Sequence, residues 1–214
     1  MLKETLEKLQ DMIPDKPSIN PKRFKDPVAK QTDWTLLSAE AANFRTHKLV
    51  TISPSRVELR PTFGGFLFAF VFMLVGMVTL GVFGILFTTK PLSFWMLIPL
   101  AIGLIFGGVG VQLLRKISTP MVFDKTRGYF WKGGEMPQNL GFSPVEEPDF
   151  ARLDEIHALQ LLEDSIDDET SSQLNLVLHD GRRIHIVSQS GGQKTRMDIL
   201  RLSGFLDVPL WDAT

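Results

Sequence analysis

The chain has 214 residues, of which 44% are hydrophobic, yet its mean hydropathy is only +0.07. Its apolar residues must therefore be concentrated in one region and diluted elsewhere. The net charge of −1, from 23 basic and 24 acidic residues, argues against a nucleic-acid binder, whose affinity rests on an excess of Lys and Arg. The absence of Cys excludes disulfides, thiolate nucleophiles and Cys-ligated zinc or iron–sulfur sites.

Residues 1–44 are predicted to form an N-terminal cytoplasmic segment that begins with an amphipathic helix. Its apolar residues follow helical spacing at Leu2, Leu6, Leu9 and Ile13. The same stretch carries charges of both signs and lacks the apolar core of a secretory signal. Two locations are open for this helix: it lies on the membrane surface, or it packs against the soluble module of the chain.

Residues 45–62 are predicted to form a strand pair that contributes to a cytoplasmic module. The strands His47–Ser53 and Arg56–Pro61 are joined by a Ser-Pro-Ser turn. In the second strand, Val57 and Leu59 alternate with charged residues, which indicates one buried face and one exposed face.

Residues 63–114 are predicted to cross a membrane twice as a helical hairpin. The first run, Phe63–Thr89, has no charged residue, and 15 of the positions from 66 to 87 are Leu, Ile, Val or Phe. On the insertion scale these side chains contribute about −5 to −9 kcal/mol, which is ample for insertion. The second run, Pro91–Leu114, is also uncharged and can span a hydrocarbon core of about 30 Å. The short link Thr88–Pro91 requires the two helices to be antiparallel neighbours.

Basic residues near the ends of the runs predict the orientation. Lys90 is the only basic residue of the link, whereas both flanks are rich in Arg and Lys. Both termini are therefore expected to be cytoplasmic, at a bacterial inner membrane. A pair of buried helices in a soluble core is the alternative, but such helices keep a polar face. Neither run contains a charged residue or a His, which argues against a transporter or channel built on one copy.

Glycines within the two runs predict a close contact between the helices. Gly103 and Gly107 stand four residues apart, a spacing that lets helix backbones approach each other. Gly76, Gly81 and Gly84 offer a comparable face on the first run. Packing within the hairpin is the favoured interpretation, and homodimerisation is the alternative.

Residues 115–214 are predicted to form a cytoplasmic antiparallel sheet with a C-terminal helix. The stretches 121–123 and 128–131 flank a polar turn and predict one strand pair. A hairpin over Leu174–Val187 is better defined, with a three-residue turn that ends at Gly181 in the left-handed conformation.

The register of that hairpin follows from its apolar pattern. A three-residue turn places Leu176 opposite Ile184 and Leu174 opposite Ile186, so the apolar side chains share one face. The other face carries Asn175, Arg183 and His185.

The rest of this region contains one more strand and two connections. The strand covers 156–162, the segment 132–147 is predicted to be a mobile loop, and the acidic run 163–169 a solvated connection. The stretch 190–192 is predicted to open a helix over 193–202. Gly204 ends that helix, and a tail at 208–211 packs on the module.

The strand pattern of Glu155–Leu162, the hairpin Leu174–Val187 and the following helix together resemble the bacterial pleckstrin-homology-like membrane proteins. The resemblance covers roughly half of the chain, and it carries no catalytic residue. It implies an α+β fold in which a small antiparallel sheet is closed by one C-terminal helix and tethered to a membrane hairpin. It also implies a binding or scaffolding module. In this chain the hairpin falls within the strand order rather than before it.

The sequence offers few candidates for chemistry. The four His residues show no metal-ligand spacing, and the acidic run lacks the order of a calcium loop. The stretch Ser190–Thr195 lacks the spacing of a phosphate loop and is better explained as a helix-entry turn. No nucleophile elbow or dinucleotide fingerprint occurs in the sequence. We therefore predict no enzyme, no bound metal and no cofactor.

A basic patch beside the membrane is the best candidate for a functional surface. Each such charge contributes about 1 kcal/mol of attraction to an anionic leaflet, although a role in setting orientation explains the charges equally well. The six residues are Arg56, Arg60, Arg115, Lys116, Lys125 and Arg127.

These observations predict a non-enzymatic inner-membrane protein with a cytoplasmic binding or scaffolding module. Its expected partners are membrane lipid and a protein, with homo-oligomers left open and nucleic acid set aside. One alternative is an immunity-type protein that protects the membrane against a delivered toxin. The other is a membrane-bound hydrolase or transferase.

Overall fold

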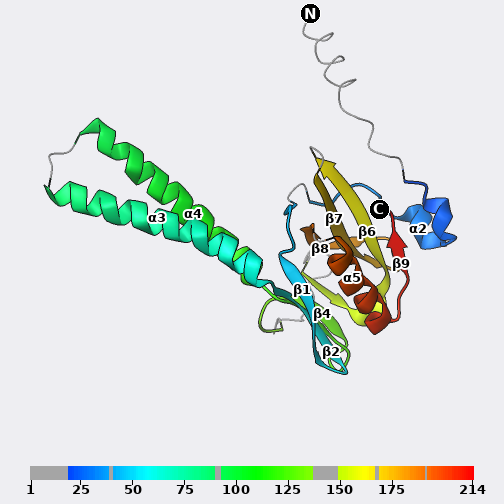
Figure 1. The fold of residues 1–214 in the computed structure, drawn as a ribbon. Helices are drawn as coiled ribbons and strands as arrows, with labels where there is room; N and C mark the ends of the chain where they lie inside the picture. The colour runs from blue at the N-terminus through cyan, green and yellow to red at the C-terminus, as the bar shows by residue number, and fades with distance from the viewer. Residues whose placement is uncertain (1–18, 39–40, 90–92, 137–148, 167–168, 191) are drawn as a thin grey trace, which may run out of the picture.

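The computed structural model describes residues 19–38, 41–89, 93–136, 149–166, 169–190 and 192–214. The described chain has an α+β fold, in which two long apolar helices project side by side from a pair of β-sheets (Figure 1). The amphipathic helix predicted at Leu2 to Ile13 lies outside the described residues. Most of the predicted loop at 132–147 also lies outside them, and its first residue, Lys132, ends a strand.

One sheet combines strands that precede the long helices in the sequence with strands that follow them. Its strands are all antiparallel and follow the chain order: β1 (His47–Ser53), β2 (Arg56–Pro61), β3 (Met121–Asp124), β4 (Tyr129–Lys132) and β5 (Phe150–Arg152). The two predicted strand pairs are confirmed. β2 and β3 are neighbours, with Leu59 opposite Met121, although the helices separate them in sequence. The polar segments before and after the helices therefore share one sheet.

The second sheet is built from strands that follow the helices. Its order is β8-β7-β6-β9, from β6 (Ile156–Ile166), β7 (Glu169–Leu178), β8 (Arg183–Gln189) and β9 (Leu210–Asp212), with β9 parallel to β6. A connection over 163–169 was predicted, but residues 163–166 and 169 belong to the paired strands, with Ile166 opposite Glu169, so the prediction is wrong for them. Residues 167–168 lie outside the described residues. Antiparallel pairing continues there because each strand satisfies the backbone groups of the other.

The register of β7 and β8 is confirmed in one half and wrong in the other. Leu176 lies opposite Ile184 as predicted. Leu174 lies opposite Val187 rather than Ile186, because a β-bulge interrupts the pairing directly after Leu174. The bulge lets two successive residues of β8 be buried.

One glycine was predicted to lie in a turn and another to end the C-terminal helix, and only the first prediction is confirmed. Gly181 adopts the predicted left-handed conformation in the turn, with φ of +85°. Gly204 does not end the C-terminal helix, since α5 covers Gly192–Leu206 and the chain leaves it at Asp207, with φ of +60°. The helix continues past Gly204 because the apolar side chains of its last turn pack against the core.

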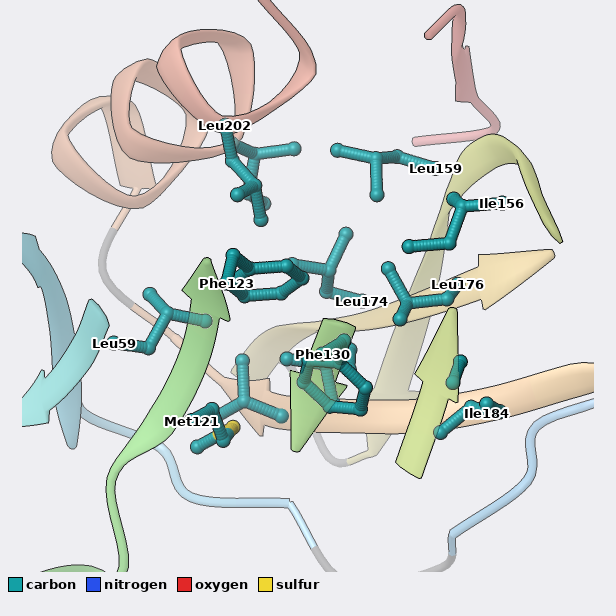
Figure 2. Close-up of a cluster of buried hydrophobic side chains, with 14 of the residues drawn as sticks. Leu59, Met121, Phe123, Phe130, Ile156, Leu159, Leu174, Leu176, Ile184 and Leu202 are labelled. Carbon is teal, nitrogen blue, oxygen red and sulfur yellow. The ribbon is translucent and has the colours of Figure 1, made fainter. Parts of the chain in front are cut away.

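The hydrophobic core lies between the two sheets and beneath α5 (Figure 2). Its labelled side chains are Leu59, Met121, Phe123 and Phe130 from the five-stranded sheet, Ile156, Leu159, Leu174, Leu176 and Ile184 from the other sheet, and Leu202 from α5. The rings of Phe123 and Phe130 meet in it with centroids 4.8 Å apart. Because both sheets share this core, the strands before the helices depend on those after them.

The described N-terminal segment covers part of the second sheet, a packing that the sequence does not predict. A 3-10 turn η1 (Pro21–Phe24) and the short helix α2 (Pro27–Gln31) lead to Trp34, whose ring stacks on Phe24 at 5.0 Å. Trp211 of β9 packs against both rings and is 2% exposed. The aromatic contacts fix this segment to the sheet.

The long helices are α3 (Phe63–Thr89) and α4 (Leu97–Ser118), and a 3-10 turn η2 (Phe94–Met96) precedes α4. Both are long and apolar enough, by length and composition, to cross a membrane. The structure thus contains the two apolar helices expected within 63–114. α4 continues beyond that range through Arg115 and Lys116.

Glycines lie where α3 and α4 cross. A Cβ on Gly76 would be 2.3 Å from the backbone nitrogen of Gly107, and a Cβ on Gly103 would be 2.7 Å from a leucine side chain of α3. The structure therefore places Gly103 and Gly107 in the contact within the hairpin. A Cβ on Gly81 or Gly84 would meet nothing within 4 Å, so these two glycines do not belong to that contact.

Candidate functional site

A pocket of about 570 Å³ opens where the two sheets meet the long helices. Its walls come from the chain before β1, the first turns of α3, the last turns of α4 and the edge strand β8. We call it the junction pocket, and its defining side chains are Phe44, Phe68, Leu113, Lys116, Lys132 and His185.

Gln189, the last residue of β8, holds the start of β1 in place beside the pocket. Its side-chain Oε1 accepts hydrogen bonds from the backbone nitrogens of Thr46 and His47, at 2.8 and 2.6 Å. Its Nε2 donates to the His47 carbonyl oxygen at 3.1 Å. Gln189 is 3% exposed, so water does not compete for these bonds.

Thr62 and His47 position the ends of the long helices at the pocket. The Thr62 hydroxyl oxygen accepts from the backbone nitrogen of Gly65 at 3.1 Å, which caps the start of α3. His47 Nε2 lies 3.2 Å from the carbonyl oxygen of Ile117, near the end of α4. Burial lowers the pKa of His47, so a neutral imidazole donates this bond at neutral pH.

One side of the junction pocket is polar. Lys116 and Lys132 are its cations, and Lys132 Nζ forms an ion pair with Asp149 at 2.7 Å. Burial, then repulsion by Lys132 and Lys116, lowers the pKa of His185 to about 4. The His185 ring is therefore neutral at neutral pH, and its Nε2 lies 2.9 Å from the hydroxyl oxygen of Ser188.

The opposite side of the junction pocket is apolar. The rings of Phe44 and Phe68 contact each other there with centroids 5.1 Å apart, and Leu113 and Ile117 contribute from α4. Phe68 is still 43% exposed, so this wall continues onto the outer surface of α3. The pocket is therefore amphipathic and open toward the helices.

The structure divides the six residues of the predicted basic patch between the two ends of the five-stranded sheet. Near the long helices lie Arg60, Arg115 and Lys116, and at the far end lie Arg56, Lys125 and Arg127. The division follows from strand direction, because β2 runs toward α3 and β3 runs away from α4. Of the six, only Lys116 lines the junction pocket.

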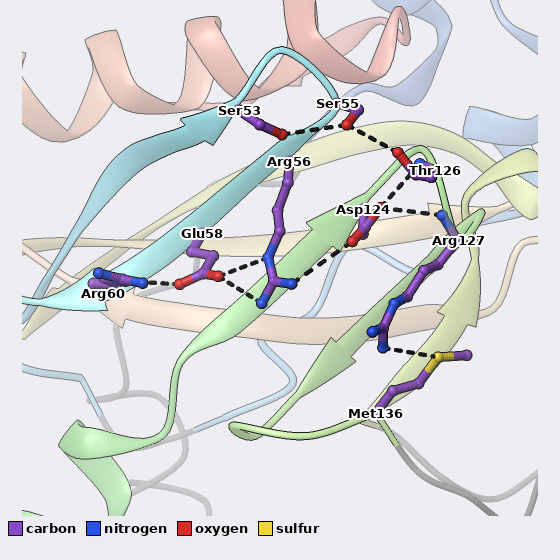
Figure 3. A network of polar contacts seen from close by, with 9 residues as sticks. All are labelled: Ser53, Ser55, Arg56, Glu58, Arg60, Asp124, Thr126, Arg127 and Met136. Carbon is purple, nitrogen blue, oxygen red and sulfur yellow. Dashed lines mark hydrogen bonds and ion pairs between the residues drawn. The ribbon is translucent and has the colours of Figure 1, made fainter.

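Arginines of the predicted basic patch make contacts within the module (Figure 3). Glu58 is 4% exposed and pairs with both Arg56 and Arg60, each at 2.7 Å. The guanidinium groups of Arg56 and Arg127 lie 5.5 and 5.7 Å from the ring centre of the buried Trp131. These contacts give Arg56 and Arg127 a structural role, because their side chains cover the sheet.

The other candidate sites of the sequence serve the fold. Within the described ranges, no group of three or more His, Asp or Glu is placed to hold a metal ion. His157 lies 3.1 Å from His179 through their Nδ1 atoms and 2.8 Å from Asp26 through its Nε2, which ties the N-terminal segment to the sheet. The stretch Ser190–Thr195 leads into α5, and its Gly191 lies outside the described residues.

No protein-family model, curated protein or solved structure matches this chain. The junction pocket must therefore be interpreted from its own geometry. The sequence does not reveal it, because Phe44, Leu113, Lys132 and His185 belong to four separate stretches. The one available signal was the position of Lys116 directly after an apolar run.

Proposed function

We propose that the chain crosses the bacterial inner membrane twice through α3 and α4, with both termini in the cytoplasm. The 27 and 22 residues of these helices correspond to about 40 and 33 Å, which is enough for a hydrocarbon core of about 30 Å. Large apolar side chains are exposed at successive positions such as Phe66, Leu67 and Phe68. Successive helical residues point in different directions, so apolar surface surrounds the helix, as is typical of lipid-facing helices.

The distribution of basic residues supports this orientation. Arg60, Arg115 and Lys116 lie on the side of the helices that faces the sheets. Lys90 is the only basic residue between the helices in the sequence. An excess of Lys and Arg marks the cytoplasmic side of bacterial membrane proteins.

We further propose that the two sheets form a non-enzymatic binding or scaffolding module at the membrane surface. The pairing of β2 with β3 carries this proposal. Thr62 alone separates β2 from α3, and Thr119 and Pro120 alone separate α4 from β3. With no flexible linker on either side, the module stays against the bilayer, and the junction pocket faces the lipid headgroups.

The arrangement of the elements also supports the proposed relation to the pleckstrin-homology-like membrane proteins. Two largely antiparallel sheets enclose one core, and α5 contributes Ile199 and Leu202 to it. A module of this kind offers surfaces for a membrane lipid or a protein partner without requiring a reaction.

The pair of His185 and Ser188 is the observation that favours a hydrolase instead. Their 2.9 Å separation permits proton transfer from a nucleophilic hydroxyl. However, an imidazole with a pKa of about 4 is a weak base at neutral pH, and the carboxylate of Asp149 pairs with Lys132. Labelling by a fluorophosphonate that is lost in Ser188→Ala would replace the binding proposal by the enzymatic one.

The absence of Cys makes a test of the orientation direct. Single cysteines are introduced as Thr89→Cys, near the far end of the helices, and as Asp180→Cys, in the exposed β7–β8 turn. In intact spheroplasts a membrane-impermeant maleimide should label T89C and spare D180C, and lysis should expose both. Ser93→Cys is the matched control and should behave like T89C. Labelling of D180C before lysis contradicts the orientation, and release of the protein by carbonate contradicts membrane insertion.

The binding role is tested by a photo-crosslinking side chain at position 185, read by mass spectrometry from living cells. The same probe at Asp180, in the exposed turn, is the control. One discrete lipid or protein adduct from position 185 supports a binding module. Adducts identical to those from position 180 contradict it.

A further inference from the structure

We propose that the end of the module farthest from the long helices binds an acidic peptide segment of a protein partner. The site is a hollow of about 450 Å³ between the β3–β4 turn and the 3-10 turn η3 (Leu153–Glu155), which follows β5. We call it the distal hollow, and its polar and charged side chains are Lys125, Arg127, Tyr129, Arg152 and Asp154. The inference names a partner for the binding module and therefore rests on the function proposed above.

Two cations of the distal hollow have no carboxylate partner within the part of the chain that the structure describes. Arg152 is compensated, because it forms an ion pair with Asp154 at 2.5 Å, and Glu155 attracts the same guanidinium group from outside the hollow. Lys125 and Arg127 form no ion pair with any described residue. Their charges therefore remain available to carboxylates of another molecule.

The two cations lie over aromatic rings on opposite faces of the five-stranded sheet. Lys125 Nζ is 4.9 Å from the ring centre of Phe205, which packs against the core between the sheets. The guanidinium group of Arg127 is 5.7 Å from the ring centre of Trp131. Trp131 follows the core residue Phe130 in β4, so strand alternation places it on the outer face. Cations on two faces suit carboxylates spaced along an extended chain better than they suit one compact anion.

The turn that carries both cations is fixed before any partner arrives. The carboxylate oxygen Oδ1 of Asp124 accepts hydrogen bonds from the backbone nitrogens of Thr126 and Arg127, at 2.9 and 3.1 Å (Figure 3). Asp124 is 6% exposed, and its Oδ2 lies 3.7 Å from Arg56. Its carboxylate thus serves the turn and Arg56. A rigid turn lowers the entropy that binding must cost.

The location and composition of the distal hollow favour a protein over a lipid or a nucleic acid. β3 runs away from α4, so under the proposed orientation the β3–β4 turn lies away from the lipid headgroups. A nucleic acid carries one charge per about 1.7 Å and needs a larger excess of cations than two. Beside the cations, the ring of Tyr129 stacks on Phe150 with centroids 5.0 Å apart. Tyr and Arg are enriched where proteins bind each other.

The experiment titrates the full chain, purified in a non-ionic detergent, against a fluorescent peptide of alternating Glu and Gly residues. Fluorescence anisotropy measures the dissociation constant. The same peptide with Gln in place of every Glu is the control ligand. The Glu peptide should bind, and more weakly as salt is added, whereas the Gln peptide should not bind. Equal affinity for the two peptides, or no binding of either, overturns the proposal.

Matched variants locate the binding. K125Q/R127Q should bind the Glu peptide about tenfold more weakly, because each exposed ion pair contributes up to about fivefold in affinity. K30Q/R182Q removes the same charge at exposed positions outside the hollow and should bind like the wild type. Equal affinity of K125Q/R127Q and K30Q/R182Q overturns the site.

Two further variants separate a loss of charge from a loss of fold. K125R/R127K keeps both charges and should keep the affinity. T126E keeps both cations but places a carboxylate between them on the exposed turn, and it should also weaken binding. Loss of binding in K125R/R127K, or unchanged binding in T126E, contradicts an electrostatic site.

Competition identifies the class of ligand. Millimolar inorganic phosphate should not displace the Glu peptide, and single-stranded DNA of equal length should bind no more tightly than the peptide. Displacement by phosphate overturns the peptide in favour of a compact anion, and tighter binding of DNA overturns it in favour of a nucleic acid.

The cysteine-labelling and crosslinking experiments separate this inference from the proposed function. A protein that inserts with the expected orientation and gives a discrete adduct from position 185, but does not discriminate between the two peptides, refutes the distal hollow alone. A protein that fails to insert refutes the membrane function, whichever peptide it binds.

Discussion

Replacing Gly76 by Ala should force the two long helices apart. A Cβ at this position would lie 2.3 Å from the backbone nitrogen and 2.4 Å from the Cα of Gly107. Ordinary van der Waals contact begins near 3.4 Å, so the backbones must separate by about 1.1 Å. Both obstructing atoms belong to the backbone, and no side-chain rotation can relieve the clash.

The expected free-energy change combines two opposing effects. Overpacking a close contact costs about 1–3 kcal/mol, whereas Ala in place of Gly within a helix gains about 1 kcal/mol. Gly81→Ala is the matched control, because a Cβ there meets nothing within 4 Å and only the gain applies. The difference in unfolding free energy between the two variants should therefore be about 1–3 kcal/mol.

Thermal unfolding of both variants in the same detergent, followed by circular dichroism, measures this difference. For a chain of this size, 1 kcal/mol corresponds to about 2–4 °C in Tm. The midpoint of Gly76→Ala should lie several degrees below that of Gly81→Ala. Equal midpoints would show that the close approach of Gly76 and Gly107 does not hold the helices together.

Three further predictions concern the module. Gln189→Leu leaves two buried backbone N–H groups without their acceptor, so it should lower the unfolding free energy by about 2–4 kcal/mol. A denaturant titration measures this loss, and the substitution Gln193→Leu at an exposed position should change the unfolding free energy little. Because the pKa of His185 is lowered from 6.5 to about 4, the unfolded chain takes up a proton first as the solution is acidified. The wild type should therefore lose stability between pH 6.5 and 4, and the Tm of His185→Gln should fall less over that window. Gly181→Ala, at a φ of +85°, should lower the unfolding free energy by about 1–2 kcal/mol, whereas Gly204→Ala within α5 should raise it by up to about 1 kcal/mol. Changes of the same sign for both variants in thermal unfolding would contradict the assigned backbone conformations.

Features that depend on neighbouring residues are predictable from the sequence. β1 and β2 have the expected bounds, 47–53 and 56–61, because the alternation and the Ser-Pro-Ser turn lie within one short stretch. The two apolar helices are predictable for the same reason. The spacing of Gly103 and Gly107 indicates a contact, but Gly76 is selected over Gly81 and Gly84 only by the crossing of the helices.

Features that depend on distant segments are not predictable in this way. The bulge after Leu174 adapts β8 to the packing of a core shared by both sheets. No pattern within one short stretch of sequence encodes that packing. The composition of the acidic run 163–169 indicates a solvated connection, yet β6 and β7 pair along its described residues because backbone hydrogen bonds do not depend on side-chain type. The contact of Trp34 with Trp211 likewise joins residues that are far apart in the sequence.

The place of the helices within the strand order has a consequence for the junction pocket. A membrane anchor attached at one end of a domain could tilt without disturbing it. Here α3 and α4 emerge between the paired strands β2 and β3, so the helices and the sheet share their boundary residues. Phe68 and Lys116 move with the helices, whereas Lys132 and His185 move with the sheets. Under the proposed membrane function, a change in how the helices lie in the bilayer would therefore alter the distance across the pocket.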